Sequence, residues 1–148
     1  MPVEILRKGA AKKFPTRKLK SIALKVLELL DRGEAEVSLV LVGNAEIKEV
    51  NARFRKKNVP TDVLSFPVKE LPGGVSLLGD VIISIEKAKQ QARERRHSQE
   101  EEMVALLIHG ILHLLGYDHE RSAREARIMK GMEKKIYRAL CEQDLLEV

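Results

Sequence analysis

The sequence predicts an α+β fold: a single domain over residues 1–148, with a mixed sheet of about four strands and about five helices. Short apolar runs typical of strands alternate with longer segments whose apolar residues recur at helical spacing. Two serines each stand three residues before a glutamate, the pattern of a helix start. A chain of 148 residues, 44% hydrophobic and 33% charged, can bury one core. The pattern does not determine the strand order.

Four segments have the composition of strands, and we expect them over residues 3–6, 37–42, 61–66 and 79–85. Residues 79–85 are apolar enough to lie centrally in the sheet. Pro60 and Pro67 bracket an extended segment, and because proline lacks a backbone donor this segment is expected at an edge. Residues 71–74, Leu-Pro-Gly-Gly, predict a turn.

Helical periodicity predicts five helices: over residues 19–30, from residue 44, over 86–95, over 98–115 and from residue 122. We expect Gly33 to stop the first helix and Asn44 to cap the second. Ser98 with Glu101 predicts a capping box for the fourth helix, and Ser122 begins the same pattern for the last. The last helix should bury one face, formed by Met129, Met132, Ile136 and Leu140.

Charge and cysteine content limit the classes of function. The formal net charge is +5, and residues 1–60 carry 14 Lys and Arg against 7 Asp and Glu. Such a basic half attracts phosphate backbones or acidic membranes, although a solvated surface explains it equally well. Cys141 is the only cysteine, which fits a reducing, cytoplasmic setting. No apolar run suits a membrane span, and no glycine-rich loop suggests a nucleotide cofactor.

Three of the four histidines lie close together in the segment HGILHLLGYDH. His109 and His113 are four residues apart, so they share one helix face. Gly116 can end that helix in the left-handed conformation, which lets His119 return to the same ion. Three nitrogen ligands with an open fourth position are typical of a catalytic zinc site. We therefore predict one Zn²⁺ per chain, held by these histidines, the alternative being three unrelated side chains.

The spacing H-x-x-x-H-x-x-G-x-x-H also occurs in metzincin proteases, so we expect a zincin-like scaffold. Those enzymes carry a glutamate as general base where this chain has Gly110. A protease without its base should be badly impaired. Three neutral imidazoles also leave the charge of the ion uncompensated, which favours an anionic substrate such as a phosphodiester.

The segment His109–His119 resembles the signature of the YbeY family of bacterial endoribonucleases. Residues 51–67 and 79–81 match the same family, in the same order, so the resemblance covers nearly the whole chain. It implies single-strand-selective RNA cleavage, maturation of the 16S rRNA 3′ end and ribosome quality control. It also implies that His109, His113 and His119 are the metal ligands and that Arg55 is the functional arginine.

Several single residues allow two interpretations. Arg55 lies in the basic cluster Arg-Phe-Arg-Lys-Lys, where a solvated helix end is the plain interpretation, but beside a metal it could bind phosphate. Asp118 could orient a ligand imidazole or shape the turn. Thr61, Asp62 and Ser65 lie on the extended segment, which could hold substrate along an edge. We expect His97 to be an exposed loop histidine.

The leading hypothesis is a zinc-dependent endoribonuclease in which Arg55 is catalytic. Its partners would be single-stranded or ribosomal RNA and the small ribosomal subunit, with no membrane and no nucleotide cofactor. Water or the RNA 2′-hydroxyl could be the nucleophile, and no general base is assigned. The rival hypotheses are a zinc protease-like hydrolase and a non-catalytic, zinc-binding ribosome-assembly factor.

Overall fold

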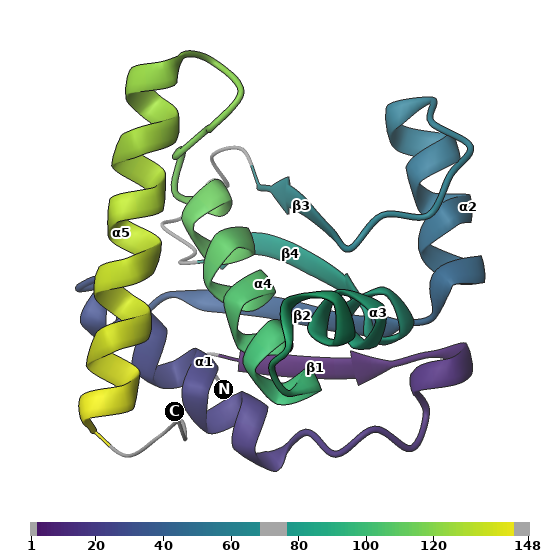
Figure 1. Ribbon diagram of the computed structural model, residues 1–148, viewed down its shortest axis with the longest axis horizontal. Helices are drawn as coiled ribbons and strands as arrows, with labels where there is room; N and C mark the ends of the chain where they lie inside the picture. Colours follow the sequence, from purple (N-terminus) through teal and green to yellow (C-terminus); the bar gives the residue numbers. More distant parts are fainter. Residues whose placement is uncertain (1–2, 69–76, 144–148) are drawn as a thin grey trace.

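A four-stranded mixed sheet forms the centre of the computed structural model, which describes residues 3–68 and 77–143. The strand order is β1-β2-β4-β3; β1, β2 and β4 are parallel, and β3 is antiparallel to β4 (Figure 1). The strands are β1 Val3–Arg7, β2 Glu36–Val42, β3 Val63–Pro67 and β4 Leu77–Ser84. The predicted central strand and the predicted edge segment are both confirmed.

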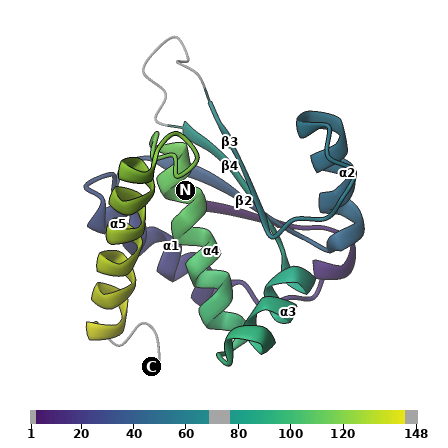
Figure 2. The same cartoon turned by 45° about the horizontal axis from the view of Figure 1, so that its top comes forward.

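The two faces of the sheet are covered by different helices, as the edge-on view shows (Figure 2). On one face Leu39, Leu41 and Val81 contact the main core beneath α1, α4 and α5. On the other face Val42 and neighbouring side chains pack against α2. The helices are α1 Arg17–Leu29, α2 Asn44–Arg55, α3 Ile85–Arg95, α4 Gln99–Leu114 and α5 Ala123–Glu142, with a short 3-10 turn, η1, at Gly9–Ala11.

The helix starts follow from their capping residues, with one correction. Ser98 accepts a hydrogen bond from the Glu101 backbone, and Ser122 accepts one from Glu125, as predicted. Asn44 is not the cap of α2: it is the first helical residue, and its side chain accepts a hydrogen bond from Ser84. Gly43 takes the cap position, where its N–H donates to Glu46 at 2.8 Å.

The end of α1 also differs from the prediction. Asp31, not Gly33, has the positive φ of 58° that turns the chain after the helix. Aspartate tolerates this conformation better than most residues because its short polar side chain can bond locally. The turn predicted at residues 71–74 lies outside the described residues. In the described part of the chain, no helix is both long and apolar enough to cross a membrane.

Helix α4 carries two of the three predicted metal ligands, His109 and His113, and is the most deeply buried helix in the described structure. It packs on β3, β4, α1, α3 and α5. Leu107, Ile108, Ile111 and Leu112 are almost fully buried, each burial contributing roughly 1.5–3 kcal/mol. Because these contacts fix the helix along its length, they also fix the side chains on its less buried face, which lies near the edge strand and includes His109 and His113.

Candidate active site

A cleft of about 680 Å³ is lined by the residues that the sequence predicts to be functional. His109 and His113 line it from α4, and His119 from the loop that precedes α5. Arg55 lines the same cleft from the end of α2, more than fifty residues earlier in the chain. The edge strand β3 and the residues before it form another wall, including Thr61, Asp62 and Ser65.

The rings of the three histidines lie next to one another, although His109 is not part of the tightest group of ligand atoms. The ring centroid of His109 lies 5.0 Å from that of His119 and 6.0 Å from that of His113, and the last two rings are 6.1 Å apart. The ligand atoms of His113, Asp118 and His119 all lie within 4.8 Å of one another. Imidazole nitrogen and carboxylate oxygen both bind zinc, so this group could hold a metal ion.

The protonation state of His113 suits metal binding. Burial lowers its pKa below the usual value for histidine, and repulsion by His109 and His119 lowers it further, against an opposing effect of Asp118. A lowered pKa keeps the imidazole neutral near neutral pH. Only the neutral ring offers a lone pair to a metal ion.

A carboxylate from another helix orients His109. Its Nδ1 lies 3.0 Å from Oε1 of Glu133, which belongs to α5. A carboxylate in this position makes Nδ1 the protonated nitrogen, so Nε2 keeps its lone pair. Carboxylates commonly hold metal-binding imidazoles in this way. Glu133 was not among the predicted site residues, although its spacing from Met129 and Ile136 places it on the inward face of α5.

Asp118 has the turn-shaping role that the sequence allowed, and its orienting of a ligand imidazole stays a prediction. Its Oδ1 accepts the backbone N–H of Glu120 at 2.9 Å, which shapes the turn. That hydrogen bond, aided by the charges of His113, Arg121 and His119, holds its pKa below the usual value. With Glu133 it places negative charge beside the three imidazoles that are predicted as ligands.

Gly110 lies where the helix crosses the sheet, and no side chain fits there. A Cβ atom at this position would lie 2.5 Å from Cγ1 of the buried Val81. The carbonyl oxygen of Gly110 accepts a hydrogen bond from Ser65 Oγ at 3.2 Å. Position 110 therefore cannot carry a glutamate in this packing, in contrast to the metzincin pattern.

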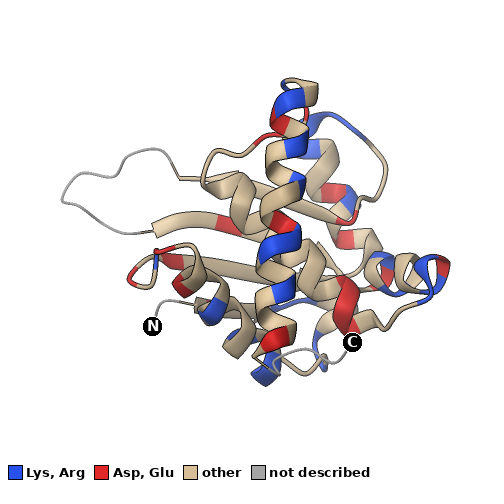
Figure 3. Ribbon diagram, turned by 60° about the vertical axis from the view of Figure 1, so that its left-hand side comes forward, with Lys and Arg blue, Asp and Glu red and all other residues tan. Residues whose placement is uncertain are grey.

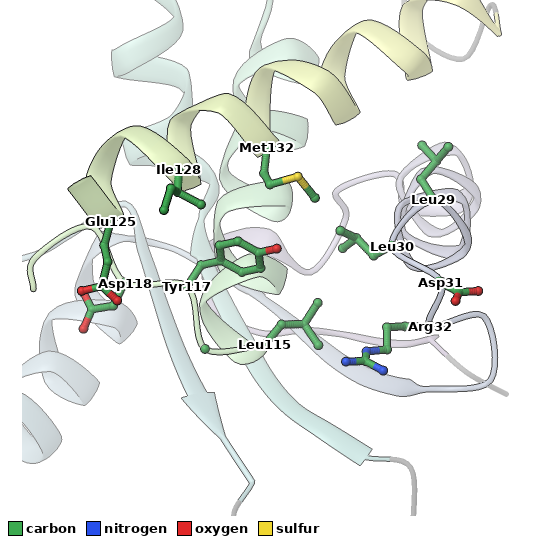
Figure 4. A pocket seen from close by; sticks show the side chains of 11 residues that line it. Leu29, Leu30, Asp31, Arg32, Leu115, Tyr117, Asp118, Glu125, Ile128 and Met132 are labelled. Atoms are coloured by element: carbon green, nitrogen blue, oxygen red, sulfur yellow. The ribbon is translucent and has the colours of Figure 1, made fainter. Parts of the chain in front are cut away.

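Tyr117, two residues before His119, anchors the loop that carries this histidine (Figure 4). Gly116 has the positive φ of 101° expected for a residue that ends α4. The Tyr117 ring then lies among Leu30, Leu115 and Met132, in a second pocket of about 560 Å³. Asp118 lines both this pocket and the cleft. Apolar burial of Tyr117 thus holds the adjoining polar residues at the cleft.

Arg55 is presented by the end of α2 and the loop that follows. Lys56 ends the helix with a positive φ of 57°. The buried Asn51 side chain donates to the carbonyl of Val59 at 2.9 Å, which ties the loop back to the helix. Phe54 meets Phe66 of β3 edge-on, with ring centroids 5.5 Å apart. These contacts connect the arginine to the edge strand.

His97 lies in the turn between α3 and α4, as predicted, but it is less exposed than expected. Its side chain is only 29% exposed, and Nε2 lies 2.6 Å from Oε1 of Glu102. Glu102 is completely buried, and a buried carboxylate requires hydrogen-bond donors, so the histidine is drawn inward. Arg95 supplies a second donor to the same carboxylate. Arg95 and Glu102 also line the cleft, and neither was among the predicted site residues.

Basic residues are not confined to the first 60 positions. Figure 3 shows Lys and Arg along α5, whose exposed members are Arg124, Arg127, Lys130, Lys134, Lys135 and Arg138. The positive charge of this helix does not appear in the net charge of the second half of the sequence, because acidic residues there offset it. The molecule therefore has a second basic surface that the sequence balance did not indicate.

The geometry defines a class of protein in which a histidine cluster at the end of a buried helix shares a cleft with an arginine and an edge strand. A family model described as Endoribonuclease YbeY matches residues 4–141. The chain therefore belongs to the YbeY family, which confirms the resemblance seen in its motifs.

Relatives and a solved structure agree with this assignment. The chain is 46% identical over 136 residues to an Endoribonuclease YbeY of Persephonella marina, covering 90% of this chain and 86% of the relative. It is 48% identical to one from a Sulfurihydrogenibium species, with coverages of 94% and 90%. The solution structure of TM1509 from Thermotoga maritima is similar at 35% identity and a TM-score of 0.66, covering 91% of this chain and 86% of that one.

Proposed function

We propose that this protein is a zinc-dependent endoribonuclease that cleaves single-stranded RNA. The observation that carries the proposal is the common cleft of Arg55 and the three histidines. Relatives of nearly the same length are named Endoribonuclease YbeY. Residues 1–148 would then form a single hydrolase domain.

His109, His113 and His119 would hold the zinc ion. The support is the closeness of their rings, the lowered pKa of His113 and the contact of His109 with Glu133. Asp118 is close enough to His113 and His119 to compete as a ligand. When bound, the ion supplies a Lewis acid toward water and phosphoryl oxygens.

The other residues of the cleft would bind and orient the RNA. Arg55 can hold a phosphate through two parallel N–H bonds and stabilise the charge that develops on it. The edge strand β3 offers an extended wall, which suits an unpaired strand. Phe66 is the only Phe, Tyr or Trp among the described residues that line the cleft, so recognition would depend on backbone charge more than on stacking.

The cellular role follows from family membership. We infer a part in 16S rRNA 3′-end maturation and in ribosome quality control, with ribosomal RNA and the small ribosomal subunit as partners. A cytoplasmic location accords with that role and with a single, unpaired cysteine. The basic residues of α5 and of the α2 end provide surfaces for an extended RNA.

A metal-replacement experiment tests the proposal. Protein stripped of metal should cleave neither single-stranded RNA nor casein, and added zinc should restore RNA cleavage only. A duplex of the same RNA sequence serves as the control for single-strand selectivity. The His113→Ala variant should lose both stoichiometric zinc and RNA cleavage.

Each rival hypothesis has its own outcome. Zinc-restored cleavage of casein, with none of RNA, would support the protease. Zinc binding without cleavage of either substrate would support a non-catalytic assembly factor. RNA cleavage at the full rate by metal-free protein would contradict the role of zinc.

A further inference from the structure

The turn between α3 and α4 buries a carboxylate at one end of the cleft. Glu102, in the first turn of α4, is 0% exposed, and no other acidic or basic residue in the described chain is buried to this degree. Its Oε2 accepts a hydrogen bond from Arg95 Nη1 at 2.8 Å. Its Oε1 contacts His97 Nε2 at 2.6 Å. Taking such a charge out of water is costly, and these two contacts offset part of that cost.

This cluster is separate from the predicted metal ligands. Glu102 precedes His109 by seven residues, which at 1.5 Å per residue is about 10 Å along the axis of α4. Arg95 ends α3, beside the start of α4, whereas His109 and His113 lie toward the end of α4 (Figure 1). The cluster and the histidines therefore lie at different points along one cleft.

The Arg95–Glu102 pair is unequally buried. The glutamate is completely covered, but the arginine side chain is 59% exposed and lines the cleft. A guanidinium carries five N–H donors in one plane. Among the described residues only one of these donors has a hydrogen-bond partner, at Glu102. The buried carboxylate thus fixes the arginine while the rest of its donors stay accessible.

An arginine fixed in this way is suited to an anion. Planar guanidinium groups bind phosphate through two N–H bonds, and prior fixation reduces the entropy lost on binding. Arg95 and Arg55 are the two arginines that line the cleft within the described residues. An RNA strand that passes the histidines would present further phosphates on either side.

We propose that Arg95, positioned by the buried Glu102, binds an RNA phosphate that flanks the one at the histidine cluster. This subsite rests on the proposed function, because it requires RNA in the cleft. His97 is a positioning residue in this arrangement: its Nε2–H donates to the second carboxylate oxygen. The subsite contributes to binding of the strand and takes no part in the chemical step.

The first test is the salt dependence of binding. Affinity for a 2′-O-methyl RNA, checked by gel electrophoresis to stay intact during the measurement, is measured over a range of salt concentrations. One lost phosphate contact lowers the slope of log K against log salt by about 0.7 for a single strand. Arg95→Ala should show that change and bind about tenfold more weakly, since bonds to charged groups are worth about 1.5–3 kcal/mol. Arg95→Lys should recover part of the affinity.

The matched control is Arg93→Ala, which removes the same charge from the same helix at an exposed position that does not line the cleft. Its slope and affinity should stay near those of the parent protein. In cleavage assays Arg95→Ala should raise KM and leave kcat unchanged. An unchanged slope and KM in Arg95→Ala, with the parent protein active on RNA, would overturn the subsite alone. Failure of the parent protein to bind or cleave RNA would overturn the proposed function as well.

Two further experiments identify the phosphate and the role of Glu102. A single uncharged methylphosphonate linkage is moved along the RNA; at one flanking position it should weaken binding to the parent protein but not to Arg95→Ala. Glu102→Gln keeps the shape of the side chain and should raise KM less than Arg95→Ala does. In the Glu102→Gln background, Arg95→Ala should have a smaller effect than in the parent. If Glu102→Gln does not fold, the methylphosphonate series is the deciding test. An equal loss of affinity at the same linkage in the parent protein and in Arg95→Ala would contradict the proposal.

Discussion

His109 Nδ1 and Glu133 Oε1 lie 3.0 Å apart and join α4 to α5 where the histidine cluster begins. Glu133→Gln should therefore weaken zinc binding by about 10- to 100-fold, the usual effect of losing a carboxylate behind a metal-binding imidazole. Zinc affinity is measured by competition with a chelator. The control is Glu142→Gln, at the exposed far end of α5, which should bind zinc like the parent. Equal affinities in all three proteins would contradict the role of Glu133.

The choice between His109 and Asp118 as a zinc ligand can be tested directly. His109→Ala should lose the stoichiometric ion, whereas Asp118→Asn should keep one equivalent, because three imidazoles suffice for a site with an open position. Elemental analysis after dialysis measures the metal content. The reverse result would make His113, Asp118 and His119 the ligand set, in accord with their separation of at most 4.8 Å.

Packing at Gly110 supports a prediction about stability. Gly110→Ala places a methyl group 2.5 Å from Val81 Cγ1 and should destabilise the protein by about 1–3 kcal/mol, despite the higher helix propensity of alanine. Urea unfolding measures the change. The matched control is Gly131→Ala in α5, where a Cβ meets nothing within 4 Å. That variant should be stabilised by up to about 1 kcal/mol.

A shift of α4 would also move the histidines, so Gly110→Ala should lower zinc affinity while Gly131→Ala leaves it unchanged. A Gly110→Ala protein as stable as the parent would show that Val81 can move aside at little cost.

Much of this architecture was predictable because it depends on local patterns. The helix starts at Ser98 and Ser122 follow from capping chemistry between neighbours, and β4 follows from its own apolar run. The positive φ at Gly116 likewise follows from its place within the histidine motif. Features of this kind are encoded over a few residues and can be read from one stretch of sequence.

What escaped prediction depends on pairs that are distant in sequence or that compete with a local rule. Glu133 meets His109 across 24 residues; its spacing in α5 indicates an inward position but not the partner that it meets there. Asn44 is a residue type that often caps helices, but its side chain instead accepts a hydrogen bond from Ser84, forty residues away. The exposure of His97 was overestimated because Glu102 looks like an ordinary charged residue of a first helical turn until its burial is known. The strand order depends on the same long-range packing.

The pKa of Tyr137 gives a prediction about pH. Burial, followed by the nearby charge of Glu101 and the hydrogen bond to it, raises this pKa from 10.0 to about 12. The folded state therefore favours the neutral phenol. This contribution to stability is complete below the pKa of about 10 in the unfolded chain and is lost as the pH rises to about 12. Melting temperatures across this range should fall less in Tyr137→Phe than in the parent protein.

The chain has one other tyrosine, which supplies the control for this experiment. Tyr117→Phe should retain the alkaline loss of stability that Tyr137→Phe reduces. Absorbance of the phenolate, followed during the same titration, should lose its component near pH 12 only in Tyr137→Phe. Identical alkaline profiles in the parent and Tyr137→Phe would show that the Tyr137–Glu101 contact does not stabilise the fold.

Arg55 provides the most direct test of the proposed chemistry. It lines the cleft with the histidines but lies on a different helix, so its removal should leave the fold and the zinc content intact. Arg55→Ala should reduce the cleavage rate with saturating single-stranded RNA by about 10²–10³-fold, the size typical of losing one contact to developing charge. Arg55→Lys should recover only part of the rate, because an ammonium group cannot form the planar pair of bonds.

The matched control is Arg53→Ala, two residues earlier in α2. Arg53 lines a groove between α2 and the sheet together with Phe54 and Ile82, and it does not line the histidine cleft. Both variants lose one positive charge from the same helix, so a general electrostatic effect on RNA would reduce their rates equally. A specific role requires that Arg55→Ala be slow while Arg53→Ala cleaves at nearly the parent rate. If Arg55→Ala also loses zinc or melts earlier, its role is structural, because a phosphate-binding arginine at the cleft wall contributes to neither property.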